Sequence, residues 1–84
     1  MRLDKYLKVS RLIKRRSVAA DACGAARVLL NGKEAKPAKE VKIGDEIEII
    51  FGASRLRVRV TETKEAIKKE DAVSLYEVID SRVV

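Results

Sequence analysis

The sequence contains no histidine, no tryptophan and a single cysteine. Cys23 therefore has no partner for an internal disulfide, and the chain offers no Cys or His pair at metal-ligand spacing for a structural zinc. Without a histidine to act as base, we expect Cys23 to be a packed small residue and not a nucleophile. This cysteine content fits a reducing cytoplasm.

Other features that the sequence lacks exclude further classes of protein. It has no Gly-rich phosphate loop, no paired-carboxylate site and no metal cluster, so we predict a protein that is not an enzyme and uses no cofactor. Aromatic residues make up 4% of the chain, which disfavours a single-strand binder of the base-stacking type. No apolar run approaches the roughly 20 residues of a membrane span, so no contact with a membrane is expected.

What the chain does contain is enough apolar sequence to fold and an uneven distribution of charge. Hydrophobic residues make up 46% of the 84 residues, which predicts one domain covering 1–84. The first 36 residues carry ten Lys or Arg against three Asp or Glu, whereas the other 48 carry nine against ten. Clustered cations attract phosphates and release counterions on binding, so the N-terminal region is predicted to bind a polyanion.

Two helices are expected in this basic region. Leu3, Tyr6 and Leu7 recur at helical spacing, which predicts a helix over residues 1–10 with one core stripe. Leu12 and Ile13 are apolar anchors in the connection that follows. Ser17 is the expected N-cap of a second helix, in which small residues form a face for close packing, and Asp21 is expected to complement the dipole near that end.

Strand and turn signals follow the helices. A buried strand is expected at 28–30, alternating strands at 46–49 and 55–60, and a last strand at 74–79, with fraying of the last few residues. Between them the sequence predicts turns at Asn31-Gly32, 33–35, Gly44-Asp45 and Gly52-Ala53, an irregular stretch at 37–42 and a loop or frayed helix at 63–71.

The turn at Gly52-Ala53 also predicts the pairing register of the two strands that it joins. A two-residue type II′ turn places Ile50 opposite Arg55, Glu48 opposite Arg57 and Glu46 opposite Arg59. Acidic and basic side chains then lie across from each other. We therefore expect Arg57 and Arg59 to be structural charge partners and not ligand contacts.

The order of several short motifs resembles the S4 RNA-binding domain family. These motifs are Arg2-Leu3-Asp4-Lys5-Tyr6-Leu7, Arg11, Arg15-Arg16-Ser17, Arg27-Val28, Asn31-Gly32, Val41 and Gly44-Asp45-Glu46-Ile47. The resemblance covers 1–51 as a core motif, with 52–84 as a strand extension. It implies an α+β fold in which two N-terminal helices pack on a small, mostly antiparallel sheet. The family usually has Gly where this chain has Ala26, so either Ala adopts the left-handed helix cap at a cost of about 1 kcal/mol or the helix ends differently.

The resemblance also implies a function. A free-standing domain of this length resembles small bacterial members of the family that bind large ribosomal subunits still obstructed by peptidyl-tRNA. It implies a cytoplasmic, ribosome-associated factor that contacts rRNA and stabilises P-site peptidyl-tRNA while an RqcH-like tailing factor adds alanines. We expect a monomer. Two alternatives stay open: an accessory RNA-binding subunit of a separate RNA-modifying enzyme, and a basic module that binds an acidic protein.

The candidate RNA-binding residues are the ten cations of the N-terminal region. Arg16 ranks first, because it matches the family's arginine before the second helix and an arginine can grip a phosphate bidentately. Arg2 and Arg11 come next, although Arg2 has an alternative as the partner of a neighbouring acid and Arg11 as a helix cap. Asp4 is expected to hold Lys8 or to orient Arg2. The full candidate set is Arg2, Lys5, Lys8, Arg11, Lys14, Arg15, Arg16, Arg27, Lys33 and Lys36.

Overall fold

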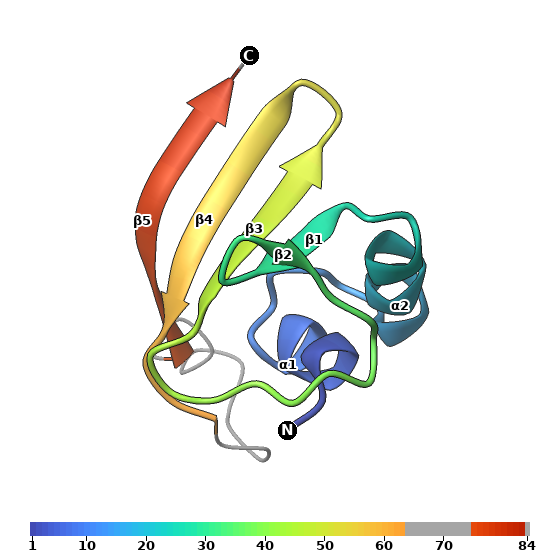
Figure 1. Ribbon diagram of the computed structural model, residues 1–84, viewed down its shortest axis with the longest axis vertical. Coiled ribbons are helices and arrows are strands. Elements are labelled where there is room, and N and C mark those ends of the chain that lie inside the picture. The colour runs from blue at the N-terminus through green and yellow to red at the C-terminus, as the bar shows by residue number, and fades with distance from the viewer. Residues whose placement is uncertain (64–74, 84) are drawn as a thin grey trace.

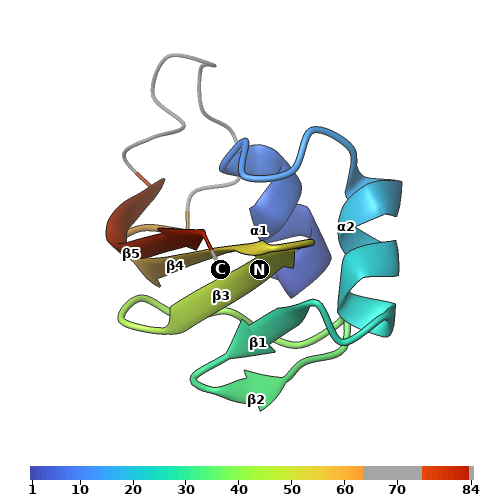
Figure 2. The ribbon, with the colours of Figure 1, turned by 90° about the horizontal axis from the view of Figure 1, so that it is seen from above.

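The computed structural model describes residues 1–63 and 75–83 as two helices and an antiparallel sheet (Figure 1). The helices are α1 (Leu3–Val9) and α2 (Arg16–Gly24), and the strands are β1 (Val28–Leu30), β2 (Lys33–Glu34), β3 (Glu46–Phe51), β4 (Ser54–Val60) and β5 (Tyr76–Val83). The strand order is β2-β1-β3-β4-β5, and every neighbouring pair is antiparallel. Both helices lie on one face of the sheet (Figure 2), so the predicted α+β fold is confirmed.

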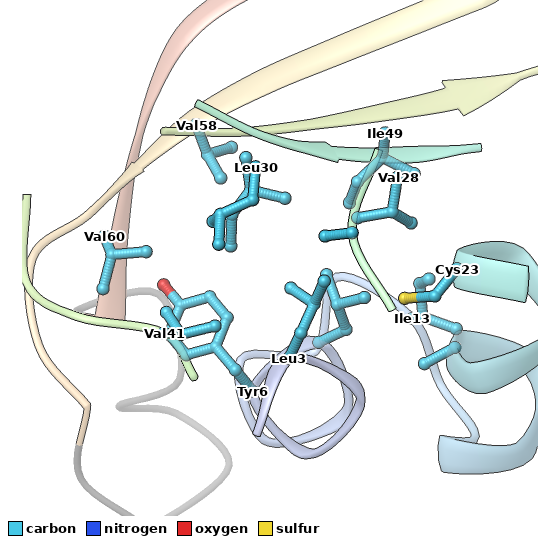
Figure 3. Close-up of a cluster of buried hydrophobic side chains, with 14 of the residues drawn as sticks. Leu3, Tyr6, Ile13, Cys23, Val28, Leu30, Val41, Ile49, Val58 and Val60 are labelled. Atoms are coloured by element: carbon cyan, nitrogen blue, oxygen red, sulfur yellow. The ribbon is translucent and has the colours of Figure 1, made fainter. Parts of the chain in front are cut away.

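Helix α1 buries the stripe that its sequence predicts. Leu3, Tyr6 and Leu7 are fully buried, and Ile13 in the connection to α2 is 7% exposed. Their side chains meet residues of β1, β3 and β4 in one core (Figure 3). Neither helix in the described parts of the chain is long and apolar enough to cross a membrane.

Helix α2 begins two residues earlier than a serine cap at Ser17 would place it. Arg15 is extended at φ −122° and ψ 137° and occupies the N-cap position, and its side chain makes no capping hydrogen bond. Ser17 therefore lies inside the first turn, and the prediction that it caps the helix is wrong. The prediction for Asp21 is also wrong, because the first turn of α2 contains no acidic residue.

The C-terminal end of α2 shows how the helix ends with Ala26 in place of the family's usual glycine. Ala26 adopts the left-handed conformation with φ 59°. The amide of Ala26 donates to the carbonyl of Cys23 at 3.2 Å, and the amide of Arg27 donates to the carbonyl of Ala22 at 2.9 Å. This pair of bonds is a Schellman motif, so the helix keeps the left-handed ending although an alanine occupies the position that favours glycine.

The strand predictions are confirmed for β1, β3 and β4 and for residues 76–79 of β5, but edge strand β2 was not predicted. Residues 33–34 form edge strand β2, paired with β1, where a turn was expected, since Asn31 and Gly32 at φ 52° and 83° already reverse the chain. Strand β5 begins at Tyr76 and continues to Val83, paired with β4, so it extends beyond the predicted end at residue 79, and the expected fraying of the last residues is not found up to Val83. Residues 64–71 of the expected loop and Ser74 of the expected strand lie outside the described residues.

The predicted β3–β4 register is confirmed. Ile50 pairs with Arg55, Glu48 with Arg57 and Glu46 with Arg59. The shortest ion pair on this face is nevertheless diagonal, because Arg57 Nη2 lies 2.7 Å from Glu46 Oε1. The twist of a strand pair brings diagonal neighbours within reach of long side chains, so the register predicts which strands exchange charge but not which side chains meet.

Candidate nucleic-acid interface

Asp4 holds two of the candidate arginines at one place. Nε and Nη2 of Arg2 each lie 3.2 Å from an oxygen of the Asp4 carboxylate. Arg16 reaches the same carboxylate from the start of α2, with Nε 3.4 Å from Oδ2 and Nη2 3.5 Å from Oδ1. The Arg2 and Arg16 side chains are 52% and 47% exposed, whereas that of Asp4 is 6% exposed. We call Arg2 and Arg16, which Asp4 holds together, the arginine pair.

The carboxyl group of Asp4 is held in its ionised form by its neighbours. Burial alone would raise the pKa of the Asp4 carboxyl, but the hydrogen bond from the Lys5 amide and the charges of Arg16 and Arg2 outweigh burial and leave the pKa below its ordinary value. One carboxylate therefore neutralises only one of two guanidinium charges. Nη1 of both arginines makes no bond to Asp4, so each retains donors for a second anion such as a phosphate.

Five other candidate cations lie on α1 or in its connection to α2. Lys8 is exposed on α1, and Lys5 on the same helix is half-buried. The remaining three are exposed in the connection between the helices: Arg11, Lys14 and Arg15. Arg11 has φ 66°, and its amide donates to the carbonyl of Lys8 at 3.1 Å, so Arg11 forms the left-handed end of α1. Together with the arginine pair, these cations make the helical side of the domain basic.

The last three candidates are further along the chain and do not form one group. Arg27 is exposed at the end of α2, where its carbonyl accepts from the Ile50 amide, whereas Lys33 and Lys36 lie beyond the other end of β1. Arg27 and the turn at Asn31-Gly32 are thus separated by strand β1. Asn31 in that turn is structural, because its side chain accepts from the Glu46 amide and donates to Asp45.

The arginines of the sheet are neutralised by their own strands, as expected. Arg57 donates to Glu46, and this hydrogen bond raises the pKa of Arg57. Arg59 Nη1 lies 2.9 Å from Glu77 on β5, and Arg55 lies 3.8 Å from Glu48. Arg55, Arg57 and Arg59 are therefore charge partners within the sheet.

Sequence reasoning missed one contact in this site. Asp4 was expected to orient Arg2, which it does, but its contact with Arg16 bridges two helices and twelve residues. The sequence carried one sign of this contact, because Asp4 is an acidic residue beside the core residue Leu3 at the start of a helix rich in Lys and Arg.

Cys23 is buried, and burial together with the charge of Asp4 raises the pKa of its thiol, as fits a packed residue.

Comparison with known proteins accounts for this arrangement of two basic helices and a sheet. A profile of the S4 domain matches residues 1–47, more than half of the chain. The chain belongs to the S4 domain family. Other S4 proteins are similar to it along nearly its whole length, so the likeness continues beyond the residues that the profile matches.

Two curated relatives are each named RQC P-site tRNA stabilizing factor. The Streptococcus pneumoniae protein is 52% identical over 79 residues, which cover 94% of this chain and 90% of the relative. The Halalkalibacterium halodurans protein is 53% identical over 78 residues, which cover 93% of this chain and 89% of the relative. Among solved structures, the trimeric Heat Shock Protein 15 of Vibrio cholerae has a TM-score of 0.86 at 32% identity, covering 93% of this chain and 80% of that one.

Proposed function

We propose that this protein is a non-catalytic RNA-binding factor of bacterial ribosome-associated quality control. It binds rRNA and tRNA on obstructed large ribosomal subunits in the cytoplasm and stabilises P-site peptidyl-tRNA. An RqcH-like tailing factor adds alanines to the nascent chain on the same particle. The factor acts as a monomer, and its helical side faces the RNA.

The observation that carries this proposal is the arginine pair. Two guanidinium groups share one buried carboxylate, so their positions are fixed before any RNA arrives. Their remaining donors and the neighbouring cations suit the recognition of a phosphate backbone by its shape. The ribosomal target rests on the relatives, whose names specify a P-site tRNA and whose similarity spans about nine tenths of both chains.

Sedimentation of the tagged protein from a bacterial lysate through a sucrose gradient tests the proposal. We expect it to migrate with large subunits that carry peptidyl-tRNA, identified by the RNA and proteins of each fraction. Migration with one RNA-modifying enzyme would instead indicate an accessory subunit. Salt-insensitive binding to an acidic protein would indicate a protein-interaction module, because a phosphate-binding surface loses affinity steeply as salt rises.

A matched pair of double variants tests the site. Arg2→Ala with Arg16→Ala should weaken binding to large subunits by about tenfold or more, since each charge-assisted bond contributes roughly 1.5–3 kcal/mol. Arg57→Ala with Arg59→Ala removes the same charge from the sheet and should bind nearly as the wild type. Equal losses in the two variants would show that only the net charge matters and would contradict the site assignment. Circular dichroism checks that both variants are folded.

A further inference from the structure

A groove beside the β1–β2 hairpin holds a second group of cations. The hairpin lies at one edge of the sheet (Figures 1 and 2). The groove has a volume of about 740 Å³, and three lysines line it: Lys33 of β2, and Lys36 and Lys39 of the segment that follows. Glu34 is the acidic residue among its lining residues. We call this feature the lysine groove.

The three lysines differ from the sheet arginines in having no ion-pair partner among the described residues. Each of Arg55, Arg57 and Arg59 forms an ion pair with a glutamate. Within residues 1–63 and 75–83, by contrast, no ion pair involves any of the three lysines of the groove. Like charges gathered around one concave surface repel each other, so an anionic occupant would stabilise this arrangement.

The remaining walls of the groove suit the uncharged part of a nucleotide. Leu30 and Ala35 are 7% and 8% exposed and, with the exposed Ala38, give it an apolar lining. A volume of this order lies in the range of small-molecule sites and accommodates one or two nucleotides. No aromatic side chain lines it, so a base or ribose would rest on aliphatic groups while the lysines contact its phosphates.

The lysine groove is joined directly to the arginine pair. The Leu3 amide donates to the Lys39 carbonyl at 2.8 Å, and the Asp4 amide donates to the Pro37 carbonyl at 3.0 Å. The segment that supplies Lys36 and Lys39 is therefore bonded to the first turn of α1, which carries Asp4. These bonds hold the cations of the groove in a fixed position relative to the arginine pair.

We propose that the lysine groove binds one or two unpaired nucleotides of the RNA whose backbone contacts the arginine pair. This inference rests on the proposed function for the nature of the ligand, and it adds a second contact point with a preference for single-stranded RNA. The favoured occupant is RNA and not an acidic peptide, because the segment that lines the groove is bonded to the turn that carries Asp4 and because apolar walls lie between the cations.

NMR titration of the ¹⁵N-labelled full chain tests this inference, with hexauridylate and hexaadenylate as probes and hexaglutamate as the competing acidic peptide. We expect amide shifts over residues 31–39 with the oligonucleotides. Lys36→Ala with Lys39→Ala should lower affinity by about tenfold and make the salt slope about 1.4 less steep, as two lost phosphate contacts predict for a single strand. Lys42→Ala is the control, since Lys42 is exposed in the same segment but does not line the groove.

Three results would overturn the inference. Shifts confined to the residues around Arg2 and Arg16 would leave the proposed function intact and remove the groove as a binding site. Stronger shifts of residues 31–39 with hexaglutamate than with either oligonucleotide would make the groove a protein-binding site. No oligonucleotide binding, together with normal sedimentation on large subunits, would show that the groove does not take nucleotides. Loss of sedimentation itself would count against the proposed function instead.

Discussion

At the scale of single residues, one buried carboxylate determines where two exposed guanidinium groups lie. Arg2 and Arg16 were each identifiable as candidates from the resemblance to S4 domains. Their convergence on Asp4 was not, because it depends on how α2 packs beside α1, which no local pattern encodes. A contact between residues 4 and 16 becomes visible only when both helices are placed.

The substitution Asp4→Asn separates positioning from net charge. It removes one negative charge, so electrostatics alone predicts tighter binding to RNA. If Asp4 positions the arginine pair, binding to large subunits should instead weaken severalfold, because an amide holds two guanidinium groups poorly. The measurement is affinity for purified large subunits at fixed salt. Asp21→Asn is the control, since Asp21 is an exposed acid on α2 and its loss should leave binding unchanged or slightly tighter.

The Asp4→Asn variant should also change how the free energy of unfolding depends on pH in the acidic range. Because the folded-state pKa of Asp4 lies below its unfolded value of about 3.9, its ionisation stabilises the fold above that pH. This contribution is lost as the pH falls through the lower, folded-state pKa. The difference in unfolding free energy between the wild type and Asp4→Asn should therefore be largest above about pH 4 and shrink below it. A stability difference that does not change with pH would contradict the ionised carboxylate.

At the scale of the elements, the chain specifies its central strands better than its edges. Gly52 at a two-residue turn and the period-two alternation on both sides were enough to predict the β3–β4 register. Strand β2 was not predictable, because a strand of two exposed charged residues shows no burial pattern. The start of α2 was misplaced because an extended arginine, and not the nearby serine, precedes the first turn.

The end of α2 offers a prediction about stability. Ala26→Gly should raise the free energy of unfolding by about 1 kcal/mol, because glycine adopts the left-handed conformation without the steric cost of a Cβ atom. Urea denaturation measures the change. Ala25→Gly is the matched control: Ala25 has φ −92°, so glycine there should lower stability. If both glycines lower stability, the left-handed ending at Ala26 does not hold in solution.

At the scale of the whole molecule, one hydrogen bond connects the two ends of the described chain. The hydroxyl of Tyr6 on α1 donates to the carbonyl of Leu75 at 2.6 Å, and both residues are fully buried. Tyr6 was expected in the core, which is confirmed. Its polar partner was not foreseeable, because a backbone carbonyl carries no sequence signal. Burial raises the pKa of Tyr6, so the hydroxyl remains a donor at any physiological pH.

Removing this hydroxyl should weaken the whole fold slightly. Tyr6→Phe should lower the free energy of unfolding by about 1 kcal/mol, at the modest end for a buried bond, because the Leu75 carbonyl also accepts from the Thr61 and Glu62 amides. Thermal and urea unfolding measure the loss. Tyr76→Phe serves for comparison, since no hydrogen bond of the Tyr76 hydroxyl to a described residue is found and its removal should cost less.

The Tyr6–Leu75 bond also has a consequence for the order in which the protein is made. The two partners are 69 residues apart, and the ribosome synthesises the helix long before the residue that its tyrosine contacts. Helices α1 and α2 are therefore synthesised well before Leu75 and β5. The core around Tyr6 can close only after Leu75 has been made, so this step of folding waits for a contact that is distant in sequence.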